Sequence, residues 1–529
     1  MLCTRIGIGV EAPSSTKENF CYTVRLATRS CTTKLGNTWT LVRPPLPHGF
    51  GYPYGNCVHN AISAVVGRIG KTVPKIDQSH VTGLKKYFRR ISNRIGPLSP
   101  LTPEEFVKNY KGAKRRRYEK AKENLASGFK QPVGKVKMFV KTEVAPYKID
   151  KAFPACRPIQ FRDYEYALEL GRFIKPVEKG LYNLAGGFGC DRHPIIAKSH
   201  NPRKRAEVLR AKWLEFRDPV AYMWDASRFD AHVSPDILSL EHLVYKRCHN
   251  SAHLNRLLRA QIENRGSFRD KDGSTIRYKV RGTRMSGDMN TASGNCIIMV
   301  SILCYVYDLT GARYSIYDDG DDSVVITEGE VDPAPLVEIF RELGFVMELE
   351  GKTRIFEEIR FCQSSPVQVR GQWTMVREPY RLLTKLLTNT SIYNERHLLR
   401  KYYTIAQCEL ACSVGVPIIQ ELCCALMLKA RSKMSRAQMV KGYDRSIVTD
   451  YRYARDLPEG WSRARPVSVH PQTRVSYAKA FGIWPSEQRS MESSLKSWNP
   501  FAVAETCESL SDRWEVPVYQ PDSNGSKLY

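Results

Sequence analysis

The chain has 529 residues, of which 42% are hydrophobic and 10% aromatic, and this content excludes a disordered chain. Its length allows roughly two to four structural units. Lysine and arginine outnumber aspartate and glutamate by 81 to 54, so the net charge of +27 favours nucleic acid or an anionic membrane as a partner.

The fifteen cysteines contain no C-x-x-C pair and no zinc-finger spacing, which predicts reduced structural thiols. The first residues lack the apolar core of a secretory leader. The longest apolar stretch, Cys296–Leu309, is interrupted by Ser301, and we expect it to be too short to cross a bilayer. These features predict a cytosolic protein, with any membrane attachment peripheral or supplied by another polypeptide.

The first part of the chain, residues 1–80, is rich in threonine, glycine and proline, which favour extended and turn structure. We therefore expect an irregular or extended lead-in. Residues 85–130 follow a helical pattern instead. Within them, Thr102 and Pro103 are typical of an N-cap and the first position of a helix, with acidic residues in the first turn.

A basic run follows at once, and its cations are Lys111, Lys114, Arg115, Arg116 and Arg117. A run of this kind on a helix is often only a solvated face. Beside the large net charge, it is also a candidate for contact with a polyanion.

A short apolar run at Val220–Trp224 predicts a strand that ends at Asp225, and a second acid, Asp230, follows five residues later. The next motif begins further along the chain with a Ser-Gly turn at Ser286. This turn leads into a predicted helix that carries Thr291 and Asn295, which are four residues apart. Both of these side chains should therefore project from one helix face.

The segment Tyr317–Ile326 predicts a hairpin whose turn contains Gly320, Asp321 and Asp322. The hairpin would present its acids beside the strand that ends at Asp225. Nucleotidyl transfer uses two metal ions about 4 Å apart, and Mg²⁺ prefers carboxylate oxygens. Acidic turns often only cap helices, but the order of acid pair, Ser-Gly turn and Gly-Asp-Asp turn favours such a site.

The last third of the chain has a mainly helical pattern, as in Leu398–Cys412 and Ile418–Ala430, and then loosens into a tail that contains proline and serine. No internal repeat is found. Gly67–Thr72 ends like a nucleotide-binding P-loop, but Val65 stands where the leading glycine is required, which argues against a helicase-type site.

Together these motifs resemble the RNA-dependent RNA polymerases of positive-strand RNA viruses, most closely the plant tombusvirus-like group with its umbravirus-like relatives. The resemblance covers roughly residues 80–490 and rests on Asp225–Val233, Ser286–Asn295 and Gly320–Asp322. Further matches are Lys141–Glu143 with Cys156–Ile159, Phe361–Gln363 with Met375–Arg377, and Phe481–Ile483.

The resemblance implies roles for the acids and for the Ser-Gly motif. Asp225 and Asp321 would hold two Mg²⁺ ions, for which Mn²⁺ could substitute, and Asp322 would be a second-line ligand. Asp230 and Asn295 would sense the ribose 2′-hydroxyl, which distinguishes ribonucleotides from deoxyribonucleotides. The residues supporting that network would be Ser286, Gly287 and Thr291.

It also implies roles for basic side chains. Lys141 and Arg157 would line the nucleotide entry path and neutralise the triphosphate. The run from Lys111 to Arg117 would follow the template channel. Relatives tend to carry a lysine after the hairpin as the general acid for pyrophosphate. Lys352 is the candidate here, with Glu348 near the expected place, and an exposed surface lysine is the alternative.

One departure concerns Asp318 and Asp319, which precede the turn where relatives often carry uncharged residues. Four acids would then crowd one hairpin. Like-charge repulsion is expected to raise some of their pKa values.

The implied fold class is α/β (α+β), a right-hand fingers–palm–thumb polymerase with an antiparallel palm sheet and a mainly helical thumb. The expected divisions are an N-terminal region at 1–80, fingers at 81–215, a palm at 216–380 with a fingers insertion near 240–282, a thumb at 381–490 and a tail at 491–529. Expected partners are template and product RNA, NTPs, a viral auxiliary replication protein, and a host membrane reached through a separate segment. The expected location is the host cytoplasm, at membrane-associated replication sites.

Two other functions explain part of the pattern. A non-catalytic RNA-binding or replication-scaffold protein accounts for the charge and the basic run but leaves the ordered acids unexplained. A reverse transcriptase shares the palm chemistry, but the Ser-Gly motif with Thr291 and Asn295 argues against it.

Overall fold

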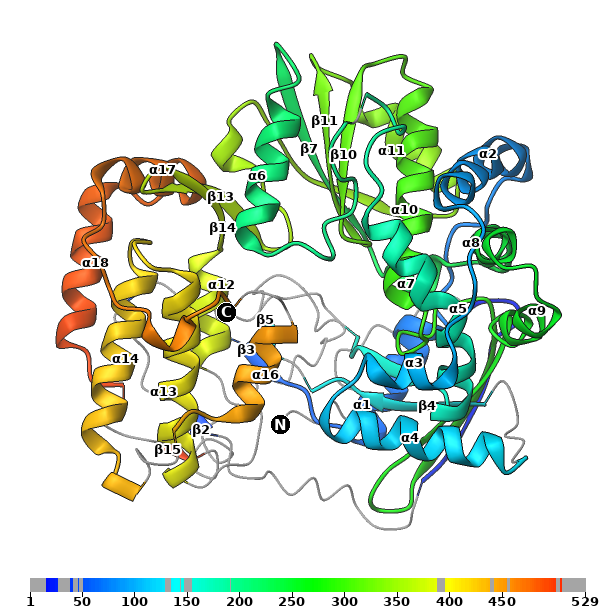
Figure 1. The fold of residues 1–529 in the computed structure, drawn as a ribbon, viewed down its shortest axis with the longest axis horizontal. Helices are drawn as coiled ribbons and strands as arrows, with labels where there is room; N and C mark the ends of the chain where they lie inside the picture. The colour runs from blue at the N-terminus through cyan, green and yellow to red at the C-terminus, as the bar shows by residue number, and fades with distance from the viewer. Residues whose placement is uncertain are drawn as a thin grey trace, which may run out of the picture.

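The computed structural model describes residues 16–26, 39–40, 46, 51–128, 135–142, 144–146, 155–190, 192–387, 395–437, 442–453, 457–500 and 505–506. Glu143 and most of the predicted tail lie outside these residues. Figure 1 displays a sheet with flanking helices at the top, a helical cluster on the left and a mixed region at the lower right.

A four-stranded antiparallel sheet forms the centre of the upper region, in the order β10-β11-β7-β12. Its strands are β7 (Pro219–Ala226), β10 (Tyr314–Asp318), β11 (Asp322–Glu328) and β12 (Met347–Thr353). The predicted strand at Val220–Trp224 and the predicted hairpin are thus confirmed.

Successive side chains of each strand point to opposite faces of the sheet, and both faces are covered by a core. Trp224 and Tyr222 lie on one face, in a core shared with long helices. Met223 lies on the other face, against α6 (Pro202–Trp213). The helices that contribute to the first core are α2 (Gln78–Ile95), α5 (Tyr164–Tyr182), α8 (Pro235–Cys248), α9 (Ala252–Arg259), α10 (Thr291–Asp308) and α11 (Pro333–Glu342).

A second, five-stranded sheet has the order β1-β9-β8-β4-β6, in which only β4 and β8 are parallel. Its strands are β1 (Cys21–Arg25), β4 (Lys135–Val140), β6 (Pro158–Phe161), β8 (Glu263–Arg269) and β9 (Thr275–Arg281). One face covers a core shared with α1 (Val58–Ala64) and the π-helix η1 (Val65–Ile69). Two of its strands come from residues 263–281, inside the predicted insertion.

A helical layer of α3 (Pro103–Lys108) and α4 (Gly112–Ala126) packs on α5 around Phe106. The predicted cap of α3 is confirmed as a capping box, in which Thr102 Oγ1 accepts a hydrogen bond from the Glu105 backbone N–H at 3.2 Å. The remaining short elements are β2 (Trp39–Thr40), β3 (Gly51–Pro53), β5 (Val144–Pro146), α7 (Phe229–His232), η2 (Phe356–Glu358), η3 (Trp461–Arg463) and β15 (Glu505–Thr506).

The C-terminal part is a helical cluster that follows a hairpin of β13 (Ser364–Val369) and β14 (Gln372–Arg377). Its helices are α12 (Pro379–Leu387), α13 (Glu395–Cys412), α14 (Ile419–Lys433), α16 (Arg445–Tyr453), α17 (Pro471–Phe481) and α18 (Pro485–Ser497). The helical prediction for this region is confirmed.

Two expectations were wrong. The lead-in contains α1, because the buried face formed by Val58, Ala61 and Ala64 outweighs the turn-forming residues on either side. The apolar stretch at Cys296 belongs to a helix that starts earlier, so α10 is long and apolar enough by length and composition to cross a membrane. It is a core helix here, since 72% of its apolar window is buried.

The Trp224→Ala variant tests the central sheet. The side chain is buried, its ring lies 5.2 Å from Phe340, and its indole N–H donates to the Tyr307 hydroxyl at 2.9 Å. Removing a buried ring should lower the free energy of unfolding by about 3–5 kcal/mol in urea denaturation. The exposed Trp484 provides the control, and Trp484→Ala should change the value by less than about 0.5 kcal/mol. Equal effects of the two variants would contradict this packing.

Candidate active site

Three carboxylates meet at one end of the four-stranded sheet. Asp225 on β7 is the direct cross-strand partner of Asp322 on β11 and of Glu348 on β12. Side chains of directly opposed residues share a face, with Cβ atoms about 4.5–5.5 Å apart. Asp321 joins them in the turn, where its carbonyl accepts a hydrogen bond from the Ala226 N–H at 3.0 Å. The fold thus brings together acids almost a hundred positions apart.

The other two acids of the hairpin are held apart from this group. Asp318 is buried on the α10 side, where Ser323 Oγ donates to its Oδ1 at 3.0 Å. Asp319 forms ion pairs with Lys198 and Arg205, each at 2.7 Å. The sequence offered no signal for these two cations, which lie on a loop and on α6 more than a hundred residues earlier.

The acid group has an excess of negative charge. Burial, and then repulsion from Glu350, Asp321 and Glu348, raises the pKa of Asp225 to about 6, against a lowering by Arg157. Burial raises the pKa of Asp322 to about 8, and repulsion from Glu350, Asp321 and Asp225 adds to it. The predicted like-charge effect is therefore present, but burial is the larger cause.

A β-bulge on β12 decides which side chains of that strand join the group. The register shifts between Leu349 and Gly351, so Glu350 is the extra residue. The bulge also pairs Lys352 with Tyr222, on the sheet face opposite Asp225.

The structure does not bring Lys352 to the acids, contrary to the expectation of a general acid. Its ammonium forms an exposed ion pair with Glu330. In a regular strand, Lys352 would share the face of Glu348 four residues earlier, but the bulge at Glu350 reverses the alternation.

The donor set suits a hard divalent cation. Carboxylate oxygens are the ligands that Mg²⁺ prefers, and mutual repulsion among these acids would be relieved by such an ion. Within the described residues, no three His, Cys, Asp or Glu side chains already form a metal cage. A Mg²⁺ ion here would complete its shell with water and substrate oxygens, as is usual for this ion.

A buried chain of polar groups runs beside the acids. Asn295 donates to Asp230, which lowers the pKa of that carboxyl, although burial outweighs this and raises it to about 6. Arg284 Nε donates to Asn295 Oδ1 at 3.0 Å and thereby fixes the orientation of the amide. The guanidinium in turn forms a buried ion pair with Glu241. Neither Arg284 nor Glu241 was predicted from the sequence.

The Ser-Gly motif is anchored to the five-stranded sheet. Ser286 Oγ donates to Pro158 O at 3.0 Å and accepts from Gln160 N at 3.1 Å. A Cβ on Gly287 would lie 2.6 Å from Gln160 O, so only glycine fits there. Thr291 Oγ1 donates to Met285 O at 3.0 Å and closes the turn. These residues shape the backbone around Asn295.

The predicted basic residues fall into two places. Arg157 lies near enough to Asp225 and Asp230 to lower the pKa of both. Lys141 is its neighbour through a backbone hydrogen bond of 2.8 Å. The cations from Lys111 to Arg117 lie on the exposed start of α4, where Arg115 pairs with Glu119 at 2.8 Å and Arg117 donates to Tyr164 at 2.9 Å.

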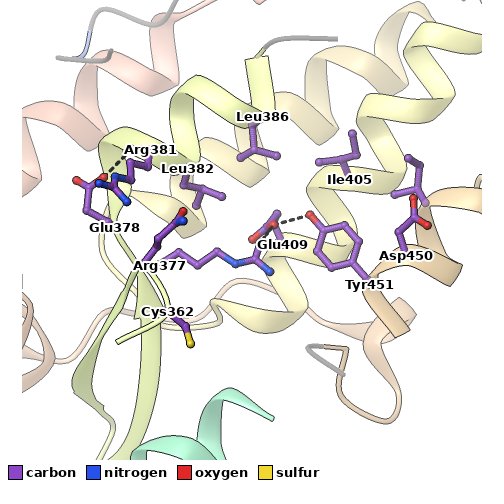
Figure 2. A pocket seen from close by; sticks show the side chains of 12 residues that line it. Cys362, Arg377, Glu378, Arg381, Leu382, Leu386, Ile405, Glu409, Asp450 and Tyr451 are labelled. Carbon is purple, nitrogen blue, oxygen red and sulfur yellow. Dashed lines mark hydrogen bonds and ion pairs between the residues drawn. The ribbon is translucent and has the colours of Figure 1, made fainter. Parts of the chain in front are cut away.

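A pocket of about 520 Å³ lies between the β13–β14 hairpin and the helical cluster (Figure 2). Cys362 forms part of its wall and donates its backbone N–H to Asp322 Oδ2 at 2.9 Å. Figure 2 shows Arg377 reaching from the hairpin to Glu409 on α13, which also accepts from Tyr451 on α16. This chain of contacts connects Asp322 with two helices.

The chain is similar to known proteins over most of its length. The family described as viral RNA-dependent RNA polymerase matches residues 61–502. The RNA-directed RNA polymerase of Melon necrotic spot virus is 35% identical over 77% of this chain and 51% of its own length. That of Turnip crinkle virus is 33% identical over 80% of this chain and 54% of its own length. The chain thus spans about half the length of these curated relatives.

The buried ion pair of Arg284 and Glu241 can be tested by the Glu241→Gln variant. Both side chains are at most 2% exposed, so the guanidinium would lose its counter-charge in a site that water does not reach. The free energy of unfolding in guanidinium chloride should fall by about 3–5 kcal/mol. The exposed pair of Arg115 and Glu119 is the control, and Glu119→Gln should cost about 0–1 kcal/mol. A comparable loss for both variants would refute the distinction.

Proposed function

Since the chain belongs to the family of viral RNA-dependent RNA polymerases, we propose that it copies an RNA template by transferring nucleotides from NTPs onto an RNA 3′-hydroxyl. In the virus this reaction would replicate a positive-strand genome. The observation that carries the proposal is the cross-strand pairing of Asp225 with Asp322, with Asp321 in the adjoining turn. A non-catalytic RNA-binding scaffold has no need of these clustered acids.

The acids would hold two Mg²⁺ ions, for which Mn²⁺ could substitute. Asp225 and Asp321 are the proposed principal ligands, and Asp322 is a second-line ligand because Cys362 already occupies one of its oxygens. When bound, the ions would activate the attacking 3′-oxygen and stabilise charge on the phosphates. Arg157 and Lys141 would bind the triphosphate and orient it toward the acids.

Selection of ribose would depend on the polar chain beside the acids. Because Arg284 engages Asn295 Oδ1, the amide N–H₂ is directed toward Asp230 and is held there. A 2′-hydroxyl can both donate and accept hydrogen bonds, so it can join this pair where a deoxyribose cannot. This selectivity also separates the proposal from a reverse transcriptase.

The architecture would be that of a right-hand polymerase with fingers, palm and thumb. The four-stranded sheet with its helices would be the palm within 216–380, the five-stranded sheet and α2–α5 the fingers with residues 263–281 inserted, and the helical cluster the thumb within 381–490. Template RNA would follow the basic start of α4. An auxiliary viral protein, a host membrane and cytoplasmic replication sites remain part of the proposal.

The first test is Asp321→Asn in a metal-dependent primer-extension assay. Asp321 is exposed in a turn, so the variant should fold, while RNA synthesis should fall by at least about 100-fold because a metal ligand is lost. Lys352→Met serves as the control and should retain synthesis within about 3-fold, since its ammonium lies on the other face of the sheet. Synthesis that survives in Asp321→Asn, or fails in Lys352→Met, would overturn the assignment concerned.

The second test concerns sugar selection by Asp230→Ala and Asn295→Asp. Loss of the oriented amide–carboxylate pair should reduce the preference for NTPs over dNTPs by about 10-fold, equivalent to one hydrogen bond. Matched incorporation rates with each nucleotide measure this preference. Asn109→Asp, an exposed amide at the end of α3, should leave the preference unchanged. An unaltered preference in both site variants would remove these residues from the role.

A further inference from the structure

The outer face of the five-stranded sheet is strongly basic. Along β8 and β9, every second side chain is buried in the core and the alternate ones are exposed or partly exposed. Cross-strand neighbours on this side include Arg265 opposite Lys279, and Lys135 opposite Arg265. We call this surface the basic face, and its cations are Lys135, Arg265, Arg269, Arg277, Lys279 and Arg281.

The charge of the basic face is left largely uncompensated within the structure. None of its six cations forms an ion pair with another residue in the described part of the chain. The neighbouring Lys137 pairs with Asp163 at 2.7 Å, and Asp270 in the β8–β9 turn is occupied by the Val58 N–H at 2.7 Å. Glu263 is the acid on these strands that faces the cations, opposite Arg281.

An aromatic pair lies at one edge of the same face. Phe139 on β4 is two residues from Lys137 and therefore shares its side of the sheet. The residue is 41% exposed, and its ring meets that of Phe161 on β6 edge-on, with 6.0 Å between the centroids. An exposed ring beside a row of cations offers a surface on which a base can stack.

The basic face extends away from the candidate active site. At the aromatic edge, β6 begins directly after Arg157 and is bonded to Ser286 through Pro158. At the opposite edge, a hollow of about 680 Å³ is lined by Arg25, Arg269 and Arg277. A strand of RNA leaving the site could therefore remain in contact with cations along the whole sheet.

We propose that the basic face binds single-stranded RNA that continues beyond the catalytic site, through its phosphates and by base stacking on Phe139. The inference extends the proposed function, since it adds a second contact with the same substrate. Sheet faces with exposed aromatic and basic side chains bind single strands in this manner. An anionic membrane would meet the same charge, but peripheral membrane binding also needs a broad apolar face to insert. Here Ser267 and Thr275 lie between the cations.

The test uses the full chain with Arg265→Gln, Arg277→Gln and Lys279→Gln combined, and measures binding of fluorescent single-stranded RNA by anisotropy over a range of salt. The triple variant should bind at least about 10-fold more weakly. The slope of the logarithm of the binding constant against the logarithm of the salt concentration should fall in magnitude by about 2, because each lost phosphate contact removes roughly 0.7. The control replaces the exposed Arg463, Arg489 and Lys496 with glutamine, which removes the same charge elsewhere. It should change affinity by less than about 2-fold.

Phe139→Ala separates stacking from charge. It should weaken RNA binding by about 5-fold or more without changing the salt dependence. Equal losses in the two triple variants, or no loss in the first, would overturn the inference. The inference would also be overturned if the first triple variant lost binding to phosphatidylserine vesicles while its RNA binding was unchanged, because the face would then be a membrane surface. RNA synthesis by the unmodified chain is measured in parallel, so that failure of the proposed catalytic function is seen independently of these binding results.

Discussion

The chemistry of this molecule depends on the register of β7 between β11 and β12. That register places Asp225, Asp322 and Glu348 in one row on one face, although their charges repel one another. Backbone hydrogen bonds and two buried faces of the sheet hold the row against that repulsion. A shift of one residue would turn the acids to opposite faces and destroy the candidate site, so the large cores on either side maintain its geometry as well as the stability of the sheet.

The surrounding ion pairs have two effects: one set neutralises an acid of the hairpin, and the other fixes the orientation of a side chain in the site. Lys198 and Arg205 neutralise Asp319 and leave Asp225 and Asp321 with an excess of negative charge that a divalent ion can satisfy. Arg284 and Glu241 are buried and paired, and they act on the site through the amide of Asn295. Cations therefore stand beside Asp319, which is held away from the acid group, and the buried network stands beside Asp230 and Asn295, the proposed ribose contacts.

The sequence was informative where structure is local. The apolar strand before Asp225, the Gly-Asp-Asp turn and the cap at Thr102 depend on neighbouring residues, and all three were predicted correctly. The bulge at Glu350 and the pairing of Asp319 with Arg205 depend on contacts between distant segments, and no local pattern reveals them. The family resemblance implied roles for the residues of the motifs but could not tell that Lys352 would face away from the acids.

The acids are connected to the helical cluster as well as to the sheet. Asp322 accepts the backbone N–H of Cys362, and both Cys362 and Gln363 have positive φ, so this short segment makes a sharp and specific turn. The same hairpin holds Arg377 against Glu409, which also accepts the hydroxyl of Tyr451 (Figure 2). A displacement of α13 or α16 would therefore change the hydrogen bond that occupies one oxygen of Asp322. Since that bond would compete with the proposed metal ion for the carboxylate, the position of the helical cluster would affect the coordinating capacity of the site.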